Sequence, residues 1–355
     1  MRRWPLYAPI AAALLLGAAA LLPPSAPLTA ACGALLVAAV LAAVHHAEVV
    51  AHRVGEPYGT LVLALAVTVI EVALIVSMMV AGGPAKAPLA RDTIFAAVMI
   101  ICNGVVGLCL LVGGLRHREQ SFRVEGAGPA LAALVALATL SLVLPTFTTS
   151  APGASYTASQ LAFAAVASLA LWGVFVFVQT VRHRDYFLPV GAPADESAHA
   201  PPPSAGQAWT SFGLLFLSLI GVVGLAKVIS PAIEAAVAAA GAPQAVIGIA
   251  IALIVLLPET AAAVRAALEN RLQTSMNLAL GSALASIGLT IPVVAAVAIA
   301  FHLPLVLGLD GKDLVLMALT FLVGGMTLGS GRTSMMQGAV HLVIFAAFLF
   351  LALVP

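Results

Sequence analysis

Two acidic residues lie deep inside long apolar stretches of this sequence. Glu71 lies in LALAVTVIEVALIVSMMV and Glu259 in IALIVLLPETAAAV, with no lysine or arginine at comparable depth. A carboxylate inside a bilayer is costly, so its presence there indicates a functional site. Carboxylate oxygens suit a hard divalent cation, and burial or a neighbouring carboxylate favours the protonated form. The pair therefore predicts a site where a metal cation and protons compete for the same oxygens.

Hydroxyl and amide side chains accompany the two acids and are candidate cation ligands. Thr68 precedes Glu71 by about one helical turn, and Asn103 lies in the next apolar stretch. In the second half of the chain, Ser282 and Ser286 follow Glu259, and their spacing of four places both on one helix face. Such groups either complete a cation shell or form hydrogen bonds between membrane helices, and the sequence leaves both roles open.

The composition indicates that the apolar stretches of this chain are embedded in a lipid bilayer. Of 355 residues, 62% are hydrophobic and 8% are charged, whereas a soluble domain has about 25% charged residues. The net charge of +1 gives no basic footprint for nucleic acid. The sequence shows no nucleophile–base pair, metal triad or nucleotide-binding loop, so we expect neither an enzyme nor a cofactor. Cys32, Cys102 and Cys109 have no metal-ligand spacing, and we expect them to pack as small apolar residues.

Eleven apolar stretches approach the roughly 20 residues that a membrane-spanning helix needs. Helices satisfy their own backbone hydrogen bonds in lipid, so we predict an all-α polytopic membrane protein. The predicted spans cover about 7–23, 28–46, 60–81, 93–115, 127–147, 158–180, 210–229, 243–264, 275–300, 312–330 and 337–354.

The basic residues predict the orientation of these spans. With the N-terminus in the cytoplasm, eleven of the fifteen basic residues fall on the cytoplasmic side, as the positive-inside rule requires. The C-terminus is then outside. The residues predicted on the cytoplasmic side are Arg2, Arg3, Arg53, Arg116, Arg118, Arg123, Arg182, Arg184, Arg265, Arg271 and Arg332. Those predicted outside or near the outer surface are Lys86, Arg91, Lys227 and Lys312.

A polar connection divides the chain into two halves. We predict an extra first helix over 1–27, for which a cleaved signal peptide is the alternative, and a cytoplasmic linker over 181–208. The segments 28–180 and 209–355 then hold five spans each. Because five is odd, successive halves have opposite orientation, which is the inverted repeat typical of secondary transporters. Glu71 and Glu259 occupy the second span of their halves.

Four stretches resemble the calcium/cation antiporter superfamily, and bacterial calcium/proton antiporters of the ChaA type in particular. They are GEPYGTLVLALAVTVIEVALI (55–75), GGLRHREQSF (113–122), NRLQTSMNLALGSALASIGLTIP (270–292) and GRTSMMQGAVHLVIFAAF (331–348). The resemblance implies an eleven-helix exchanger with Glu71 and Glu259 as the cation and proton carriers. Many members have Asn three residues before each glutamate, where this chain has Thr68 and Leu256.

The sequence therefore predicts exchange of Ca²⁺ for H⁺ by alternating access across a bacterial inner membrane, with lipid and the transported ions as partners. Exchange of Na⁺ or K⁺ for H⁺ is the alternative, and a passive cation channel is a more distant one. Histidine can sense pH near neutrality. We expect His45, His46 and Glu48 to form a solvated cluster at the membrane surface, and His341 to be a hydrogen-bonded packing residue.

Overall fold

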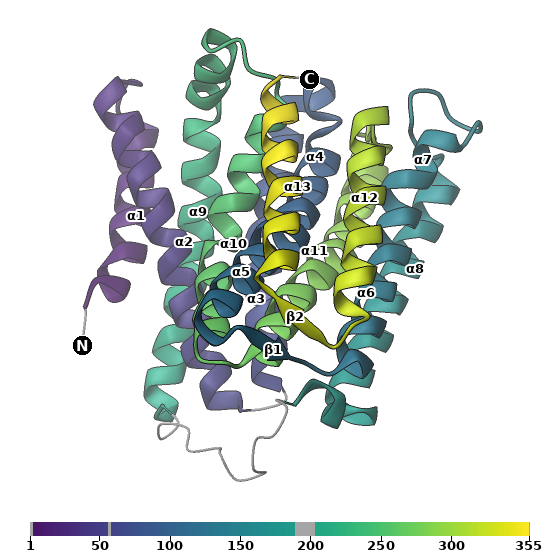
Figure 1. The fold of residues 1–355 in the computed structure, drawn as a ribbon. Coiled ribbons are helices and arrows are strands. Elements are labelled where there is room, and N and C mark those ends of the chain that lie inside the picture. Colours follow the sequence, from purple (N-terminus) through teal and green to yellow (C-terminus); the bar gives the residue numbers. More distant parts are fainter. Residues whose placement is uncertain (1–2, 56–57, 189–202, 355) are drawn as a thin grey trace. The chain divides into compact units, whose positions relative to one another are not determined.

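The computed structural model describes residues 3–55, 58–188 and 203–354. Almost all of them are helical (Figure 1). The helices are α1 Trp4–Leu21, α2 Ala26–Val54, α3 Tyr58–Gly82, α4 Leu89–Met99, α5 Val106–His117, α6 Val124–Ala138, α7 Leu144–Phe147, α8 Ala158–Phe177, α9 Ala205–Ala239, α10 Ala245–Leu268, α11 Leu272–Ala300, α12 Gly311–Leu328 and α13 Met335–Leu353.

Ten helical segments in the described part of the chain are long and apolar enough to span a membrane. Several combine more than one element, because short π-helices continue α4 into α5 (η2, Ile100–Val105), α6 into α7 (η3, Thr139–Val143) and α8 onward (η4, Val178–Arg182). With α3, whose apolar part is Ala64–Val80, the segments match the eleven predicted spans. The prediction of an all-α polytopic membrane protein is confirmed. The largest boundary difference is at α9, which runs through Pro231 to Ala239.

Side-chain caps fix where three of the long helices begin. At all three starts the side chain of a glutamine at the third helical position accepts a hydrogen bond from the amide of the cap residue. At two of them the hydroxyl of the cap residue also accepts a hydrogen bond from the amide of that glutamine. This reciprocal capping satisfies amide groups that a helix N-terminus leaves without partners. The pairs are Thr157 with Gln160, Ser204 with Gln207, and Ser334 with Gln337.

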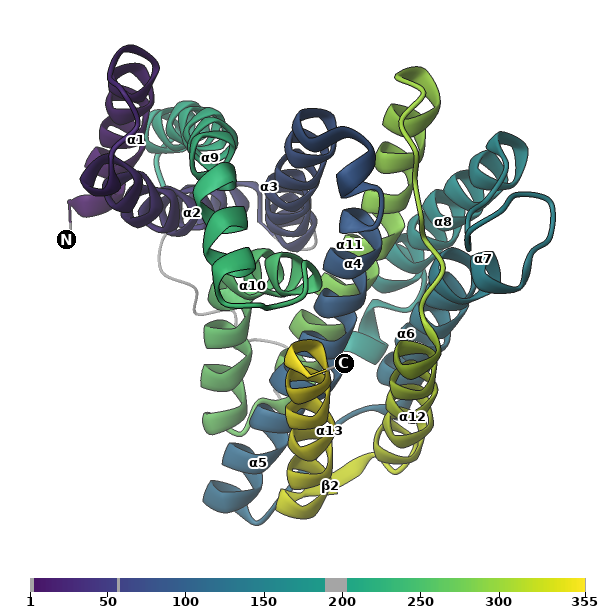
Figure 2. The same ribbon diagram turned by 90° about the horizontal axis from the view of Figure 1, so that it is seen from above.

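The chain forms two compact units, and each is described separately. The first comprises Met1–Gly82 and Asp195–Ile247, and the second comprises Gly83–Ala194 and Gly248–Pro355. In the first unit α1, α2 and α9 pack side by side, and α3 packs on α2 and α9 (Figure 2). Each unit therefore contains helices from both the N-terminal and the C-terminal part of the sequence.

A buried histidine holds the first helix of the first unit in place. His46 is 2% exposed, and its Nε2 donates to the carbonyl of Pro5 at 2.9 Å, while Nδ1 lies 3.3 Å from Ser211 Oγ. Pro9 has no N–H, so the Pro5 carbonyl lacks the donor that an α-helix would supply. The prediction of a solvated cluster is therefore wrong for His46, although the neighbouring His45 is exposed.

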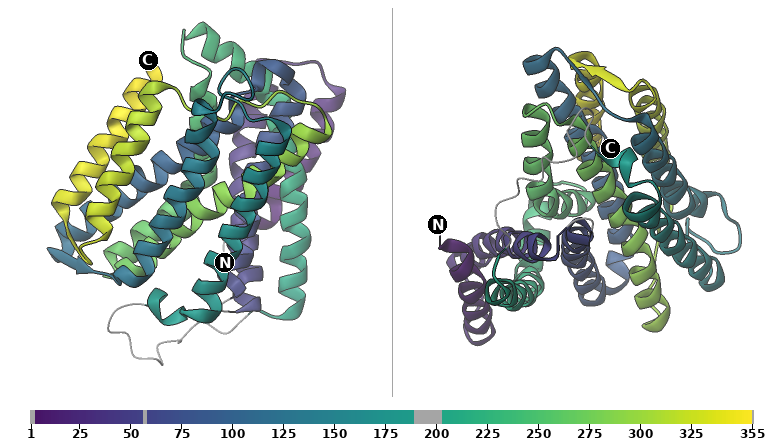
Figure 3. Two further views of the ribbon diagram at one scale, coloured as in Figure 1. Left: turned by 90° about the vertical axis from the view of Figure 1, so that its right-hand side faces the viewer. Right: turned by 90° about the horizontal axis from the view of Figure 1, so that it is seen from below.

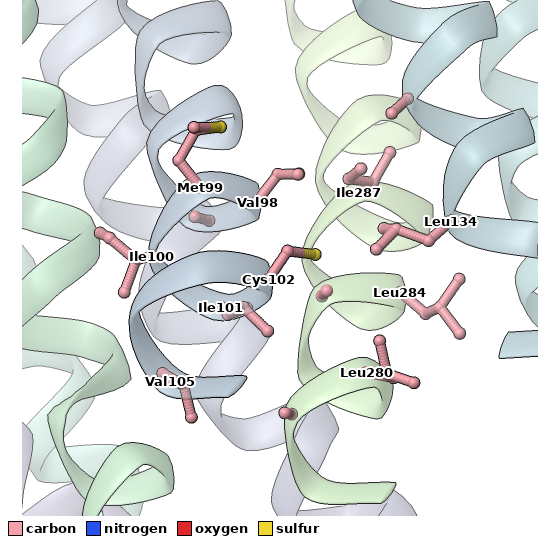
Figure 4. Packing of buried hydrophobic residues seen from close by; sticks show 14 of the residues in the cluster. Val98, Met99, Ile100, Ile101, Cys102, Val105, Leu134, Leu280, Leu284 and Ile287 are labelled. Carbon is pink, nitrogen blue, oxygen red and sulfur yellow. The ribbon is translucent and has the colours of Figure 1, made fainter. Parts of the chain in front are cut away.

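The second unit has α11 at its centre. α11 packs on α8, on α6 and on the continuous helix α4–η2–α5, and α13 packs on α5 and α12 (Figure 3). Cys102 points from η2 towards α11, and Leu134 of α6 meets Leu284 and Ile287 of α11 (Figure 4). Cys32, Cys102 and Cys109 are all free and buried, which confirms their predicted packing role.

Two short strands close one end of the second unit. β1 Glu119–Ser121 follows α5, β2 Arg332–Ser334 precedes α13, and they pair antiparallel with Gln120 opposite Thr333. The pairing joins two loops that are far apart in the sequence. The all-α expectation did not include these strands.

Candidate cation and proton site

In the first unit, the acidic residue of the candidate site is buried on α3. Glu71 is 3% exposed and Thr68, one turn earlier, is 4% exposed. The Thr68 hydroxyl donates to the carbonyl of Ala64 at 2.9 Å. Its proton is thus committed to the helix, and the oxygen lone pairs are available to accept from a neighbour or to bind a cation.

In the second unit, Glu259 lies on α10 directly after Pro258. The residue is half-buried, and its Oε2 atom has no accessible surface. The helix continues through Pro258, but proline supplies no amide, so the carbonyl of Ile254 lacks its ordinary helical donor. A carboxylate and a backbone carbonyl without its usual donor thus occur within about two turns of one helix.

A row of hydroxyl side chains runs along α11 at intervals of four residues. Ser282 and Ser286 both lie within the uninterrupted helix α11, where a spacing of four places them on one face. Ser286 is 2% exposed and Ser282 is half-buried. The row continues to Thr290, which is fully buried. Its Oγ1 has no hydrogen-bond partner among the described residues. Thr290 was not among the predicted ligands, although its spacing of four from Ser286 could have indicated it.

Asn103 lies in the π-helix η2, fully buried, and its polar contacts lead to α12 and α13. Its Nδ2 donates to Thr320 Oγ1 at 2.8 Å, and its Oδ1 lies 3.1 Å from Nδ1 of His341. The other ring nitrogen of His341 lies 3.1 Å from Thr327 Oγ1. We call these four residues, each at most 3% exposed, the amide–imidazole network.

The bonding fixes the direction of each hydrogen bond in the amide–imidazole network. The Thr320 hydroxyl donates to the Leu316 carbonyl at 2.7 Å, so it accepts from Asn103 Nδ2. Asn103 Oδ1 can only accept, so His341 Nδ1 carries a proton and donates to it. In the neutral imidazole, Nε2 then accepts from the Thr327 hydroxyl. His341 is thus the hydrogen-bonded packing residue that the sequence predicted, and Thr320 and Thr327 are partners that the sequence did not indicate.

Glycines bring α5 and α13 close enough for this contact. A Cβ on Gly107, one turn beyond Asn103, would lie 2.9 Å from the Cβ of His341. A Cβ on Gly338 would overlap the amide of Leu111. Small residues allow such close helix packing in membranes. The position of His341 beside Asn103 therefore depends on these glycines.

Replacement of Asn103 by Leu is expected to lower the free energy of unfolding by about 1–2 kcal/mol, because a buried donor and a buried acceptor lose their partner. The measurement is denaturation of the purified protein in detergent, followed by circular dichroism. Ser282→Ala is the control, since Ser282 is only half-buried. A stability equal to that of the wild type would contradict the role assigned to the amide–imidazole network.

The family model described as "Sodium/calcium exchanger protein" matches this chain over residues 25–181 and 210–354. These two stretches include all of the candidate residues. The match is thus split at the polar connection that separates the two halves.

Curated relatives extend over most of the chain. y4hA of Sinorhizobium fredii, provisionally named an ionic transporter, is 52% identical and covers 99% of this chain and 95% of its own length. The sodium-potassium/proton antiporter ChaA of Escherichia coli is 36% identical over 88% of this chain and 85% of its own. A Ca²⁺/H⁺ antiporter of Aphanothece halophytica is 25% identical over 75% of each chain.

Solved structures show the same fold. Native YfkE matches with a TM-score of 0.75 and 19% identity, covering 99% of this chain and 100% of YfkE. The H⁺/Ca²⁺ exchanger CAX matches with a TM-score of 0.69 and 15% identity, covering 98% of this chain and 88% of CAX. The predicted resemblance is confirmed: the chain belongs to the sodium/calcium exchanger protein family and is a multi-pass membrane cation exchanger.

Proposed function

We propose that this protein exchanges Ca²⁺ for H⁺ across a bacterial inner membrane by alternating access, and that Glu71 and Glu259 bind both ions. The observation that carries the proposal is a carboxylate within an apolar helix in each unit, with Glu71 only 3% exposed. The names of the Aphanothece and CAX relatives, both calcium/proton exchangers, support the choice of ions.

The exchange follows from the cost of buried charge. Two ionised carboxylates without a counter-ion are unfavourable in a low dielectric, so either protons or a cation must neutralise them. Binding of protons therefore opposes binding of the cation. If the protein can change between its inward-facing and outward-facing conformations only when it is loaded with protons or with the cation, it exchanges the two ions across the membrane. Thr68, Ser282 and Ser286 are proposed to add hydroxyl oxygens to the cation shell, and Asn103 its amide oxygen, which also accepts from His341.

Exchange of Na⁺ or K⁺ for H⁺ is the second candidate, favoured by the identity to Escherichia coli ChaA. Leu256, three residues before Glu259, is buried and supplies no side-chain oxygen. Calcium takes 6–8 oxygen ligands. A site with fewer oxygen ligands is better suited to a cation that needs fewer of them.

Transport measurements in proteoliposomes distinguish the two candidate functions. We expect an imposed pH gradient to drive Ca²⁺ transport against the Ca²⁺ gradient, at a rate that saturates as the Ca²⁺ concentration rises. Transport of Na⁺ and K⁺ under the same pH gradient should be weaker or absent. Transport of Na⁺ or K⁺ alone would establish the second candidate. Downhill flux that no proton gradient can reverse would instead identify a channel.

The orientation is proposed from the arginine distribution, with the N-terminus in the cytoplasm and the C-terminus outside. Two Ser→Cys variants test it. Ser150→Cys lies in an exposed loop, and Ser197→Cys lies in the linker, outside the described residues. In intact cells an impermeant thiol reagent should label the first and spare the second. The wild type is the control, because its three cysteines are buried. The opposite labelling pattern would reverse the orientation.

The division into an extra helix over 1–27, repeats over 28–180 and 209–355, and a linker over 181–208 also remains a proposal. The split family match, over 25–181 and 210–354, supports it.

A further inference from the structure

The C-terminal end of α10, the helix that carries Glu259, is bonded to the segment where α5 meets β1. His117 Nε2 lies 2.9 Å from the carbonyl of Leu268, the last residue of α10. Gln120 Nε2 donates to the preceding carbonyl, that of Ala267, at 2.9 Å, and to Asn270 Oδ1 at 3.0 Å. We call these side-chain bonds the α10 tether.

The α10 tether occupies carbonyls at a helix end. Asn270, with φ of 59°, turns the chain out of the helix, and the Arg271 amide returns to the Ala266 carbonyl. Helix C-termini leave carbonyls without helical donors, and side chains commonly supply the missing bonds. Gln120 reaches its position because it lies against Gly113, where any Cβ would overlap the Gln120 amide.

The two members of the tether differ in their response to pH. A carbonyl only accepts, so His117 Nε2 carries a proton in every state in which the bond exists, and Nδ1 is where the ring gains a second proton. Imidazolium would then face the C-terminal end of α10, where the helix dipole is negative, and its hydrogen bond would be charge-assisted. The Gln120 amide does not titrate.

The surrounding charges are carried by the segments that meet here. They are Arg116 and Arg118 at the end of α5, Glu119 on β1, Arg265 and Glu269 at the end of α10, Arg271 before α11, and Arg332 on β2. The closest ionic contact among them is Arg271–Glu269, at 3.8 Å. His117 is the histidine of this set, and imidazole is the side-chain type whose reference pKa lies nearest neutrality.

We propose that His117 is a proton-controlled positioning residue, whose protonated form strengthens the α10 tether and slows the conformational step of exchange. The inference rests on the proposed role of Glu259. About nine residues of helix, roughly 13 Å at 1.5 Å per residue, separate Glu259 from Leu268, so His117 acts through α10 and does not touch the ion. A bond that is stronger in one conformation shifts the population towards it.

The test compares His117→Gln with wild type in proteoliposomes at saturating cation, while pH at the face carrying β1 is varied from 8.5 to 5.5. Glutamine keeps an N–H donor but cannot gain charge. The maximal rate of the wild type should fall about twofold to fivefold more on acidification than that of the variant, the range expected for a charge at a helix terminus. The pH dependence of the half-saturating concentration should be the same in both. Gln120→Ala is the control, and it should keep the wild-type pH dependence of the rate.

A second measurement does not depend on transport. Amide hydrogen exchange of residues 265–271, corrected for the intrinsic effect of pH, should slow on acidification in the wild type and in Glu259→Gln, but not in His117→Gln. Identical pH dependence of this protection in wild type and His117→Gln would overturn the inference. Normal cation exchange by Glu259→Gln would refute the proposed function and leave the tether result standing.

Discussion

Glu71→Gln and Glu259→Gln should each reduce coupled exchange to the rate of empty liposomes, while the protein remains folded and inserted. Glutamine has nearly the same size as glutamate, so packing around a residue such as Glu71, 3% exposed, is retained. It cannot release or bind a proton in this pH range, and it cannot neutralise half of a divalent charge. The measurement is cation-dependent proton flux at equal amounts of reconstituted protein.

Glu269→Gln is the matched control for these two variants. Glu269 follows the end of α10, and its side chain is 52% exposed with only a distant ion pair to Arg271. The same chemical change there should leave exchange intact, because exposed ion pairs contribute little. If either Glu71→Gln or Glu259→Gln exchanged at the wild-type rate, the assigned role of that residue would be wrong.

Calcium affinity should fall as the pH is lowered from about 9 to 6, by up to tenfold per pH unit for each proton that the metal displaces. The sign follows from competition: lower pH raises the population of protonated carboxylate, which cannot bind the metal. Two coupled acids titrate as one unit, so the slope reports the pair and not either residue. The measurement is equilibrium Ca²⁺ binding to the purified protein at a series of pH values.

The slope also distinguishes the carboxylates from the histidines. His341→Gln should leave the pH dependence of Ca²⁺ affinity unchanged, because both ring nitrogens of His341 are engaged within the amide–imidazole network. A flat affinity over the whole range, with both glutamates intact, would show that protons follow another route. His45, His46 and His341 would then be the residues to replace next.

The sequence by itself determined the fold class, the number of spans and the two acids. These properties depend on local composition, since the apolar length of a segment decides whether it spans lipid and a carboxylate among apolar residues is recognisable in place. The length of an apolar segment and the position of a residue within it can be read from that segment alone. Glu71 and Glu259 could therefore be identified without knowledge of the neighbouring helices.

The tertiary structure decided which polar groups meet. Asn103 bonds to Thr320 and His341, which lie 217 and 238 residues away, and the glycines of α5 and α13 make that approach possible. Buried His46 has a hydrogen-bond partner in α1, because Pro9, 37 positions earlier, leaves the carbonyl of Pro5 without its helical donor. Partners of this kind depend on the rotation and close packing of helices that are remote in the sequence. The periodicity of a single segment shows which face of the helix is polar, but it does not show which residue of another helix that face contacts.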